Sequence, residues 1–317
     1  MTSNQKTALV LGAKGFVGRH ASRALAADGV RVTGLGHGAW SEQEALGWGV
    51  ARWVEGEIDI DALESLGLEA PPDAIIHCGG SGAVSFSYGQ PLEDFKRSVD
   101  TTAAVLEWVR REQRSPCRLV VVSSAAVYGD QGEVDLTEMA TRSPVSPYGF
   151  HKLAAESLCD SYARFFGVKV SVVRLFSVYG QGLRKQLLWD AMNKFSRGED
   201  QFFGTGRELR DWIHVDDAAR LLAAAAWAPQ ADFEIINGGH RHADTRTVLE
   251  RLAASAGLPL RPRFNGETHA GNPRRLTADC GHARRQLGWT PAISLEDGLA
   301  RYATWFAQER DAGRIPS

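Results

Sequence analysis

Short apolar runs alternate with amphipathic stretches along the first half of the chain. Five of these runs predict buried strands, at residues 7–12, 30–35, 74–77, 119–123 and 168–176. Three stretches between them have the apolar spacing of helices, at residues 17–28, 98–111 and 148–166. Because the strands are apolar on both faces and alternate with helices, the pattern predicts an α/β fold, with a parallel sheet covered by helices on both sides.

The pattern changes after residue 177, where Gly and Arg become more frequent. Residues 204–210 have the composition of a loop, and from residue 244 onward we expect short helices and irregular loops. The apolar run at residues 215–236 is similar to the first half again. We therefore expect two parts: a larger domain of residues 1–176 with about 215–243, and a smaller region of residues 177–214 and 244–317.

The composition is that of an ordinary globular chain. Of its 317 residues, 44% are hydrophobic and 23% are charged, which argues against disorder. Lys and Arg number 36 against 38 Asp and Glu, so the net charge of −2 offers no basic surface for nucleic acid. The polar start of the chain is unlike a signal peptide, and the longest apolar stretch, residues 221–228, is far shorter than the roughly 20 residues that span a bilayer. We expect a cytoplasmic protein without a membrane or nucleic-acid partner.

The four cysteines are widely and unevenly spaced, at Cys78, Cys117, Cys159 and Cys280. The sequence contains no Cys-x-x-Cys pair and no histidines at the spacing of metal ligands, so we expect neither a metal site nor disulfides. Free thiols suit a reducing cytosol.

A glycine-rich turn connects the first predicted strand to the first predicted helix. It comprises Gly12, Ala13, Lys14, Gly15, Phe16, Val17 and Gly18. Glycines make such a turn tight and let the backbone approach a pyrophosphate, which the positively polarised N-terminus of the helix then holds. We therefore expect this turn to bind a dinucleotide through its three glycines and the side chains or backbone of residues 14, 16 and 17.

Tyr148 and Lys152 lie four positions apart in a predicted helix and therefore share one of its faces. A phenol with a pKa of about 10 is a poor base at neutral pH, and a nearby ammonium group favours its ionised form. Ser124 ends a predicted strand, where a hydroxyl faces the crevice in which open α/β sheets bind ligands. These three residues are the candidates for catalysis. We interpret Ser123 as a turn residue that bonds the backbone, and His151 as a surface or core histidine.

The spacing Gly-x-x-Gly-x-x-Gly, Ser124 ahead of Val-Tyr-Gly, and Tyr148-x-x-x-Lys152 together resemble the extended branch of the short-chain dehydrogenase/reductase superfamily. Its members are NAD(P)-dependent nucleotide-sugar epimerases, dehydratases and reductases, and the resemblance covers nearly the whole chain. It implies a Rossmann-type doubly wound parallel sheet with a smaller C-terminal substrate-binding region, and a catalytic triad of Ser124, Tyr148 and Lys152. By analogy it also implies a homodimer formed through the helices at 98–111 and 148–166.

The resemblance implies further cofactor contacts. Glu57 and Ile58 match the segment that holds the adenine, although Glu57 is alternatively an exposed acid before a helix. Three residues that follow a histidine stand where the family commonly places its cofactor-contacting His-x-Ala-Ala: Cys78, Gly79 and Gly80. Lys152 would also hold the hydroxyls of the nicotinamide ribose, beside Tyr148.

The end of the second strand distinguishes the two dinucleotides. An NAD enzyme normally carries an acid there, which bonds the ribose 2′-hydroxyl. This chain instead has Gly36, His37 and Gly38, without a carboxylate that would repel a 2′-phosphate, and Lys14 stands where some NADP-using relatives meet that phosphate. We therefore predict NADP(H) over NAD, with His37 among the contacts. The alternative is that Lys14 is a solvated loop lysine and that backbone contacts suffice for NAD.

The resemblance also locates a nucleotide-sugar pocket. Ser177 stands where the family usually has an asparagine, so a hydrogen bond to the substrate is altered or lost. Arg210 matches an arginine that pairs with the diphosphate, since a guanidinium fork suits phosphate oxygens; the alternative is a structural ion pair with an aspartate of the same motif. In the second half of that diphosphate site, His269 replaces an arginine of the family, and Arg274 or Arg275 would compensate.

Two activities are compatible with these residues. The family's 4,6-dehydratases carry an Asp-Glu pair directly after the catalytic hydroxyl, whereas Ala125 and Ala126 cannot transfer a proton. The leading prediction is an NADP(H)-dependent oxidoreductase that reduces a 4-keto nucleotide-diphosphate sugar, and the alternative is an NAD-dependent nucleotide-sugar 4-epimerase. A non-catalytic NADP-binding regulator is a third hypothesis, against which the intact triad argues. The nucleotide, the sugar and the stereochemistry stay open at this point.

Overall fold

A computed structural model describes residues 5–68, 70–111, 117–227, 232–268 and 271–315. Its main feature is a seven-stranded sheet in which every neighbouring pair is parallel. The strands are β1 (Thr7–Leu11), β2 (Arg31–Gly36), β3 (Val50–Glu55), β4 (Ala74–His77), β5 (Arg118–Ser124), β6 (Lys169–Leu175) and β10 (Phe233–Gly238). Their spatial order is β10-β6-β5-β4-β1-β2-β3.

The strand order reverses between β1 and β4. From β1 the chain adds β2 and β3 on one side, and it then crosses over to add β4, β5, β6 and β10 on the other. The connections after β1 and β4 leave the sheet in opposite directions, which opens a crevice at the carboxyl ends of these two strands. The predicted α/β class, with a doubly wound parallel sheet, is confirmed.

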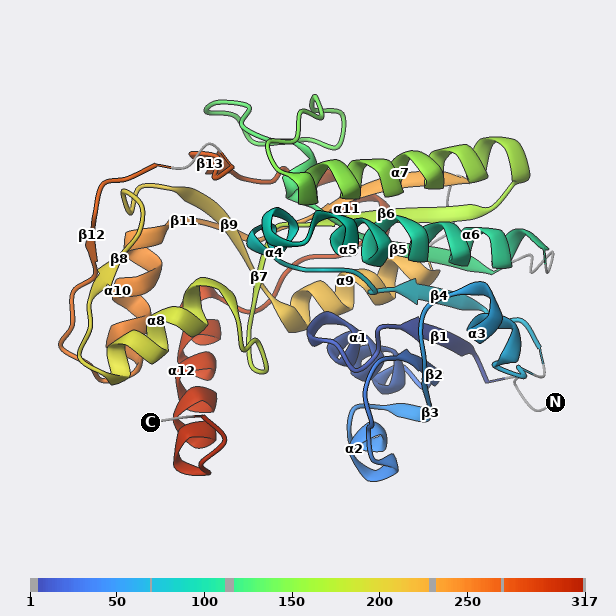
Figure 1. Ribbon diagram of the computed structural model, residues 1–317, viewed down its shortest axis with the longest axis horizontal. Helices are drawn as coiled ribbons and strands as arrows, with labels where there is room; N and C mark the ends of the chain where they lie inside the picture. The colour runs from blue at the N-terminus through green and yellow to red at the C-terminus, as the bar shows by residue number, and fades with distance from the viewer. Residues whose placement is uncertain (1–4, 69, 112–116, 228–231, 269–270, 316–317) are drawn as a thin grey trace.

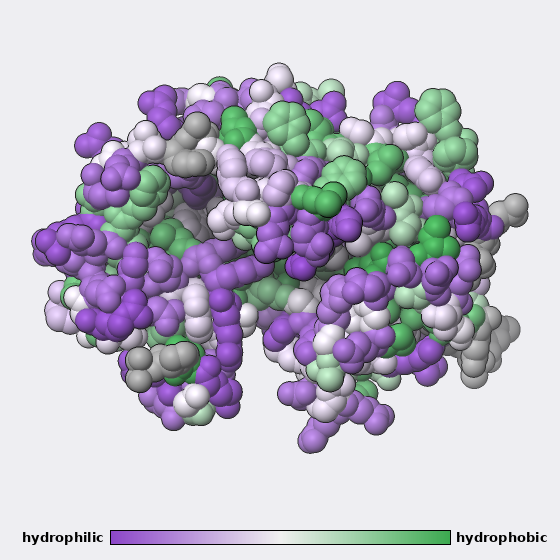
Figure 2. Space-filling model, in the orientation of Figure 1, coloured by the Kyte–Doolittle hydropathy of each residue, from purple (hydrophilic) through white to green (hydrophobic). Residues whose placement is uncertain are grey.

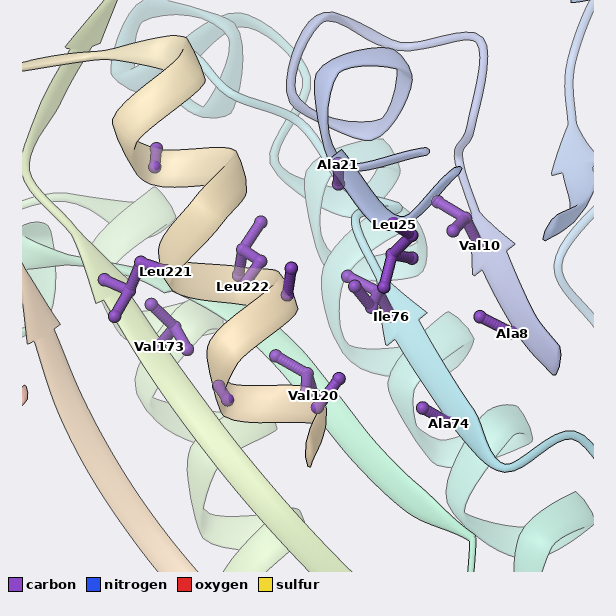
Figure 3. Close-up of a cluster of buried hydrophobic side chains, with 14 of the residues drawn as sticks. Ala8, Val10, Ala21, Leu25, Ala74, Ile76, Val120, Val173, Leu221 and Leu222 are labelled. Carbon is purple, nitrogen blue, oxygen red and sulfur yellow. The ribbon is translucent and has the colours of Figure 1, made fainter. Parts of the chain in front are cut away.

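Each strand sends alternate residues to opposite faces, and each face has its own helices (Figure 1). Ala8 and Val10 of β1 belong to one apolar cluster, which Figure 3 shows between the sheet and two helices. Leu9 and Leu11 belong to another cluster on the opposite face. The first face is covered by α1 (Phe16–Ala27) and α9 (Val215–Trp227), and the second by α6 (Thr101–Arg111) and α7 (Pro147–Phe166).

The remaining helices of this domain are short and lie in the connections. They are α2 (Glu42–Gly47), α3 (Ile60–Ser65), α4 (Val84–Gly89), α5 (Pro91–Phe95), a π-helical turn (Lys96–Asp100) and a 3-10 turn (Ala125–Val127). The π-helical turn occupies the beginning of the helix predicted at 98–111, so that regular α-helix starts only at Thr101.

A second lobe lies beyond the carboxyl edge of the main sheet, on the left of Figure 1. Its central strand, β9 (Leu209–His214), pairs with three other strands: β7 (Ser177–Tyr179), β11 (Arg241–Asp244) and β13 (Arg275–Leu276). A separate pair consists of β8 (Gln201–Phe202) and β12 (Arg263–Phe264). Three helices share the lobe's apolar core: α8 (Gln186–Ser196), α10 (Thr245–Ser255) and α12 (Leu295–Asp311).

The structure also differs from the sequence prediction in β3, in β9 and in α12. β3 was not predicted because it is an edge strand, so its polar side chains interrupt the apolar run. Leu209 and Arg210, which we expected in a loop, begin β9. The expectation of only short helices after residue 244 is wrong for the 17-residue α12, whose charged surface hides a stripe of buried residues at Leu295, Leu299 and Tyr302.

One segment of the C-terminal range returns to the main sheet. The helix α11 (Gly281–Leu287) contacts α9 and β10, and Ala283 and Trp289 join the apolar cluster of Figure 3. The chain therefore crosses between the two lobes once more after β13.

Candidate active site

The glycine-rich turn follows β1 and leads into α1. Gly12 has a φ of +75°, which a residue with a side chain rarely adopts. A Cβ atom on Gly18 would overlap the carbonyl oxygen of Gly12 and lie 2.8 Å from its carbonyl carbon, so the backbone there leaves no room for a side chain. Gly15 caps α1 without a side-chain hydrogen bond, which leaves backbone N–H groups of the first turn free for an anion.

The loop after β4 lies against this turn. A Cβ atom on Gly12 would come within 3.1 Å of the Cys78 carbonyl carbon and the Gly79 nitrogen. Burial raises the pKa of Cys78 to about 12, so its thiol is neutral. The two predicted cofactor segments therefore meet at the point where the strand order reverses.

Two buried polar atoms beside this loop have no hydrogen-bond partner within the described part of the chain: Ser98 Oγ and His77 Nδ1. Burial lowers the pKa of His77 to about 3, with the Lys152 charge as the second cause, so the ring is neutral. Unpaired buried polar atoms are costly, and a polar ligand that supplies partners would remove that cost. Together with the glycine turn, these atoms fit a dinucleotide.

The three candidate catalytic residues come together at the carboxyl end of β5. Ser124 is the last residue of that strand; its Oγ accepts from the Ala126 nitrogen at 3.2 Å, and its hydroxyl is close enough to Tyr148 to lower the pKa of the phenol. Lys152 Nζ lies 6.0 Å from the centre of the Tyr148 ring and donates to the carbonyl oxygen of Val122 at 3.0 Å. A Cβ atom on Gly80 would lie 3.2 Å from the same Nζ, which places the ammonium group beside the candidate cofactor loop.

Local sequence fixes the start of the helix that carries two of these residues. Ser146 caps α7 by accepting from the Gly149 nitrogen at 3.2 Å, and Pro147 occupies the first turn, where its missing N–H costs nothing. The Tyr148 nitrogen donates to Ser87 Oγ at 3.0 Å, which ties the first turn of α7 to α4.

Burial governs the ionisation of both groups. It raises the pKa of Tyr148 to about 12, against the lowering effect of the hydrogen bond from Ser124, and the charge of Asp94 raises it further. Burial lowers the pKa of Lys152, while the charge of Asp94 is the largest opposing cause. The phenol therefore holds its proton until a further positive charge lies beside it, and the ammonium group is poised to lose its own more easily than a surface lysine.

The residues predicted for the adenosine end gather beyond β2. Lys14 Nζ donates to the Ala39 carbonyl oxygen at 2.5 Å, so this lysine has a structural partner in the loop that follows the strand. His37 and Glu57 pair at 3.4 Å, and both side chains are exposed. Ile58 is buried against Gly79.

The predicted substrate residues are only partly brought together. Ser177 begins β7 and lies opposite Trp212 of β9, two residues from Arg210. Arg210 donates to Asn272 Oδ1 at 2.5 Å and to the Leu209 carbonyl oxygen at 2.8 Å, and burial lowers its pKa to about 10.

The neighbouring charged residues have partners of their own. Asp211 pairs with His242 at 3.1 Å, and Arg275 pairs with Asp135 at 2.7 Å. The backbone nitrogen of Arg274 donates to a carboxylate oxygen of Asp130 at 3.3 Å. The charge of Asp130 also raises the pKa of Arg210, against the effect of burial. His269 lies outside the described residues. Arg210 and Arg274 therefore remain candidates for an anionic substrate group, whereas Arg275 is engaged.

Sequence reasoning missed three polar residues around the candidate catalytic pair. They are Ser81, Asp94 and Ser98, which lie in the loop after β4 and in the helical segment 91–100. His151, which we interpreted as a surface or core histidine, is largely buried, and its Nδ1 pairs with the fully buried Asp94 at 2.5 Å. No sequence signal indicated this pair, because its members are far apart in the chain.

Neither a metal site nor a membrane-spanning helix occurs among the described residues. They contain no group of three or more His, Cys, Asp or Glu side chains placed to hold a metal ion. None of their helices combines the length and apolar character needed to cross a bilayer.

Comparison with known proteins identifies relatives along almost the whole chain. The model of the NAD dependent epimerase/dehydratase family matches residues 8–239. A UDP-glucuronate 4-epimerase of Thermodesulfobacterium geofontis is 28% identical over 311 residues, which are 94% of this chain and 95% of the relative.

Solved structures agree over a similar length. The UDP-glucose 4-epimerase of Thermotoga maritima, solved with UDP-glucose, matches with a TM-score of 0.86 and 26% identity over 96% of this chain and 99% of that one. MoeE5, in complex with UDP-glucuronic acid and NAD, matches with a TM-score of 0.85 and 28% identity over the same shares of the two chains.

Proposed function

Since the chain belongs to the NAD dependent epimerase/dehydratase family, and is thus an NAD(P)-dependent nucleotide-sugar enzyme, we propose that it is a nucleotide-sugar 4-epimerase that uses NAD. The observation that carries the proposal is the meeting of Tyr148, Ser124 and Lys152 at the carboxyl end of β5. Two of the relatives named above are 4-epimerases of UDP-sugars, and MoeE5 was solved with UDP-glucuronic acid and NAD. They support the epimerase over the NADP(H)-dependent reductase that the sequence favoured.

Each side chain has a defined task in this proposal. Bound NAD would accept a hydride from carbon 4 of the sugar and later return it to the opposite face. Tyr148, as phenolate, removes the proton of the 4-hydroxyl and gives it back at the end, so no net proton is consumed. Ser124 holds the same oxygen through its hydroxyl, and the Lys152 ammonium lowers the pKa of the phenol.

The residues after Ser124 argue against a dehydratase. Ala125 and Ala126 form the 3-10 turn that follows β5, and Ala125 is buried. Elimination of water from the sugar needs a second acid and base beside the first hydroxyl, and two methyl groups supply neither. The proposal is therefore limited to hydride transfer with a single proton carrier.

The 4-keto reductase remains a second candidate because of one specific observation. No carboxylate ends β2, where an NAD enzyme normally has one, and Lys14 lies at that end of the strand. For the reductase, a 2′-phosphate would share Lys14 with the Ala39 carbonyl oxygen. Lys14→Met would then weaken NADP⁺ binding at least tenfold without affecting NAD⁺, whereas in the epimerase both affinities would change little.

The most informative experiment identifies the cofactor. Purified protein is denatured and the released nucleotide is identified and quantified. We expect NAD⁺ in near-stoichiometric amount, together with interconversion of UDP-glucose and UDP-galactose, or of the corresponding uronates, followed by NMR. An empty protein that oxidises NADPH with a 4-keto sugar and epimerises nothing would refute the proposal in favour of the reductase.

A pair of variants tests the role of the phenol. Tyr148→Phe should lower turnover by about 10²–10⁴-fold while the cofactor stays bound. Tyr88→Phe is the matched control, since Tyr88 is an exposed tyrosine of nearby α4 whose hydroxyl donates to the Val145 carbonyl oxygen. Equal activity of the two variants would remove Tyr148 from the mechanism.

We also propose that the main sheet domain holds the cofactor, that the second lobe holds the nucleotide sugar, and that two copies associate. Figure 2 shows apolar side chains among polar ones near α5 and the start of α7. Leu92, Phe95 and Phe150 are exposed there, with Leu92 at 67%. Sedimentation should give a dimer, and replacement of Leu92 and Phe150 by serine should shift the equilibrium toward the monomer.

A further inference from the structure

A buried carboxylate joins three segments around the candidate catalytic pair. Asp94 lies in α5 and has no exposed surface. Ser81, in the loop after β4, donates its hydroxyl to Oδ1 of Asp94. His151 of α7 pairs through Nδ1 with Oδ2 at 2.5 Å, and the ring of Phe95 packs edge-on against the imidazole with centres 5.5 Å apart. The carboxylate therefore has a partner on each oxygen, one from the loop and one from the helix.

The Asp94–His151 pair lies next to the candidate catalytic residues Tyr148 and Lys152. His151 stands between Tyr148 and Lys152 in the first turns of α7, and its side chain is only 16% exposed. Among the charged groups, Asp94 has the largest effect on both residues: its charge raises the pKa of Tyr148 and also that of Lys152. The proposed mechanism above uses neither Asp94 nor His151.

A purely structural role explains a buried carboxylate poorly. Taking a charge out of water is expensive, and well-packed apolar residues of similar volume are often at least as stable as a buried charge with its partners. What the carboxylate adds is a fixed negative charge and a directional link between the loop and the helix. Both would be lost in an apolar substitute.

We propose that Asp94 and His151 are positioning residues of the active site. The carboxylate holds the loop after β4 against α7 and keeps one negative charge beside Tyr148 and Lys152. This inference rests on the proposed roles of Tyr148 and Lys152 in epimerisation. Asp94 and His151 touch neither the sugar nor the cofactor in this account and act through the two other residues.

The sign of the electrostatic effect is defined. A neighbouring negative charge opposes ionisation of Tyr148 and favours the ammonium form of Lys152, so it moves both pKa values upward. Loss of the charge moves both downward. Activity that needs an ionised Tyr148 and a protonated Lys152 then shifts as a whole to lower pH, because its acidic and basic limits move in the same direction.

The other ionisable groups near Asp94 and Lys152 belong to α5, the π-helical turn, the loop after β4 and α7. On the side of Asp94, Glu93 and Arg97 pair at 2.7 Å, and Lys96 follows on the same segment. Cys78 of the loop after β4 and two groups of α7, Glu156 and Cys159, also raise the pKa of Lys152. Glu156 is paired with Arg174 at 2.6 Å.

The test compares two isosteric substitutions on one helix. Asp94→Asn removes the buried charge, while the amide can still pair with the Ser81 hydroxyl and with the other tautomer of His151. Glu93→Gln removes an exposed charge from the preceding position and is the matched control. We expect Asp94→Asn to shift both limits of the pH–activity profile down by about one unit, and Glu93→Gln to leave them in place.

A second readout does not depend on activity. The ionisation of Tyr148 is followed by ultraviolet absorbance as the difference between each protein and its Tyr148→Phe counterpart, with NAD added. Its pKa should fall by about one unit in Asp94→Asn and should not change in Glu93→Gln. His151→Ala should lower turnover about tenfold or more, and His151→Asn, which restores a donor to the carboxylate, should recover most of it.

The outcomes separate the two proposals. Superimposable profiles and an unchanged Tyr148 pKa in Asp94→Asn would overturn the positioning role, whatever the substrate. The same holds if Glu93→Gln shifts the Tyr148 pKa as far as Asp94→Asn does. A lowered Tyr148 pKa in a protein that epimerises no nucleotide sugar would support the positioning role while refuting the proposed function.

Discussion

The buried ion pair beneath the candidate active site gives the sharpest prediction about stability. Glu156 of α7 and Arg174 of β6 are 1% and 0% exposed. Arg174 donates to the carboxylate through Nε at 2.9 Å and Nη2 at 2.6 Å. The interpretation of Ser123 as a turn residue is wrong: it lies in β5 and donates its hydroxyl to the same carboxylate at 2.5 Å. This pair fixes α7 to β6, the strand next to β5 in the main sheet. The perturbation is Glu156→Gln, which preserves shape and removes the charge.

The expected loss follows from what remains buried. Removing one partner of a buried pair typically costs about 3–5 kcal/mol, since the other charge is left without compensation. Arg174 keeps two acceptors, the Tyr128 hydroxyl at 2.8 Å and the Glu138 carbonyl oxygen at 3.1 Å, and the glutamine oxygen can accept one further bond. We therefore expect a loss at the lower end, about 3 kcal/mol in the free energy of unfolding. A double variant with Glu156→Leu and Arg174→Met should lose less than Glu156→Gln alone, because no unpaired charge remains.

The assay is equilibrium unfolding in urea, followed by both tryptophan fluorescence and circular dichroism at equal cofactor occupancy. Coincident transitions are required before a free energy is extracted. Asp160→Asn is the control, since Asp160 and Arg164 form an exposed pair one turn further along α7, and its loss should stay below about 0.5 kcal/mol. A loss below about 1 kcal/mol for Glu156→Gln, or one no larger than that of the control, would refute the reasoning.

Three further predictions concern the cofactor site and pH. Gly18→Ala should abolish cofactor binding and destabilise the fold by at least about 2 kcal/mol, because its Cβ would lie 2.9 Å or less from rigid backbone. Its control, Gly47→Ala, lies in open space on α2 and should be neutral or stabilising in a thermal melt. Ser98→Ala should leave the cofactor-free protein at least as stable, because it removes a buried hydroxyl that lacks a partner within the described chain, and it should weaken NAD binding severalfold in calorimetry; equal affinities would contradict this. The hydrogen bond to Asp211 raises the pKa of His242, so the imidazolium contributes stability below its unfolded pKa of about 6.5 and loses that contribution as pH rises through the raised folded value. His242→Gln should therefore destabilise the protein at pH 5.5 by at most about 1 kcal/mol, with the difference vanishing at pH 9; a constant difference would exclude titration of His242 as the cause.

The sequence carries the local features of this protein because they depend on spacing within one element. The strand at Ala74–His77 was predicted with its bounds, since a continuous apolar run needs no information from elsewhere. The turn that contains Gly12 could be recognised for the same reason. Tyr148 and Lys152 share a helical face by their separation of four, and Ser124 ends a strand by the change from apolar to small polar residues.

Contacts between distant segments were beyond the reach of such patterns. His151 and Asp94 are 57 positions apart, and nothing in either neighbourhood indicates that α5 packs on α7. Arg210 was expected to face a diphosphate or a neighbouring acid, and only the approach of a loop 62 positions away supplies Asn272 as its partner.

The physical reason is the range of the forces involved. Periodicity and backbone conformation act within a few residues and determine that strands, a glycine turn and a Tyr–Lys face exist. Charge pairing and desolvation act between whichever groups the chain topology brings together, and their strength depends on burial, which no single segment encodes. The sequence alone thus determined most elements of the main sheet and the candidate chemistry, while the tertiary structure decided which buried charges surround that chemistry.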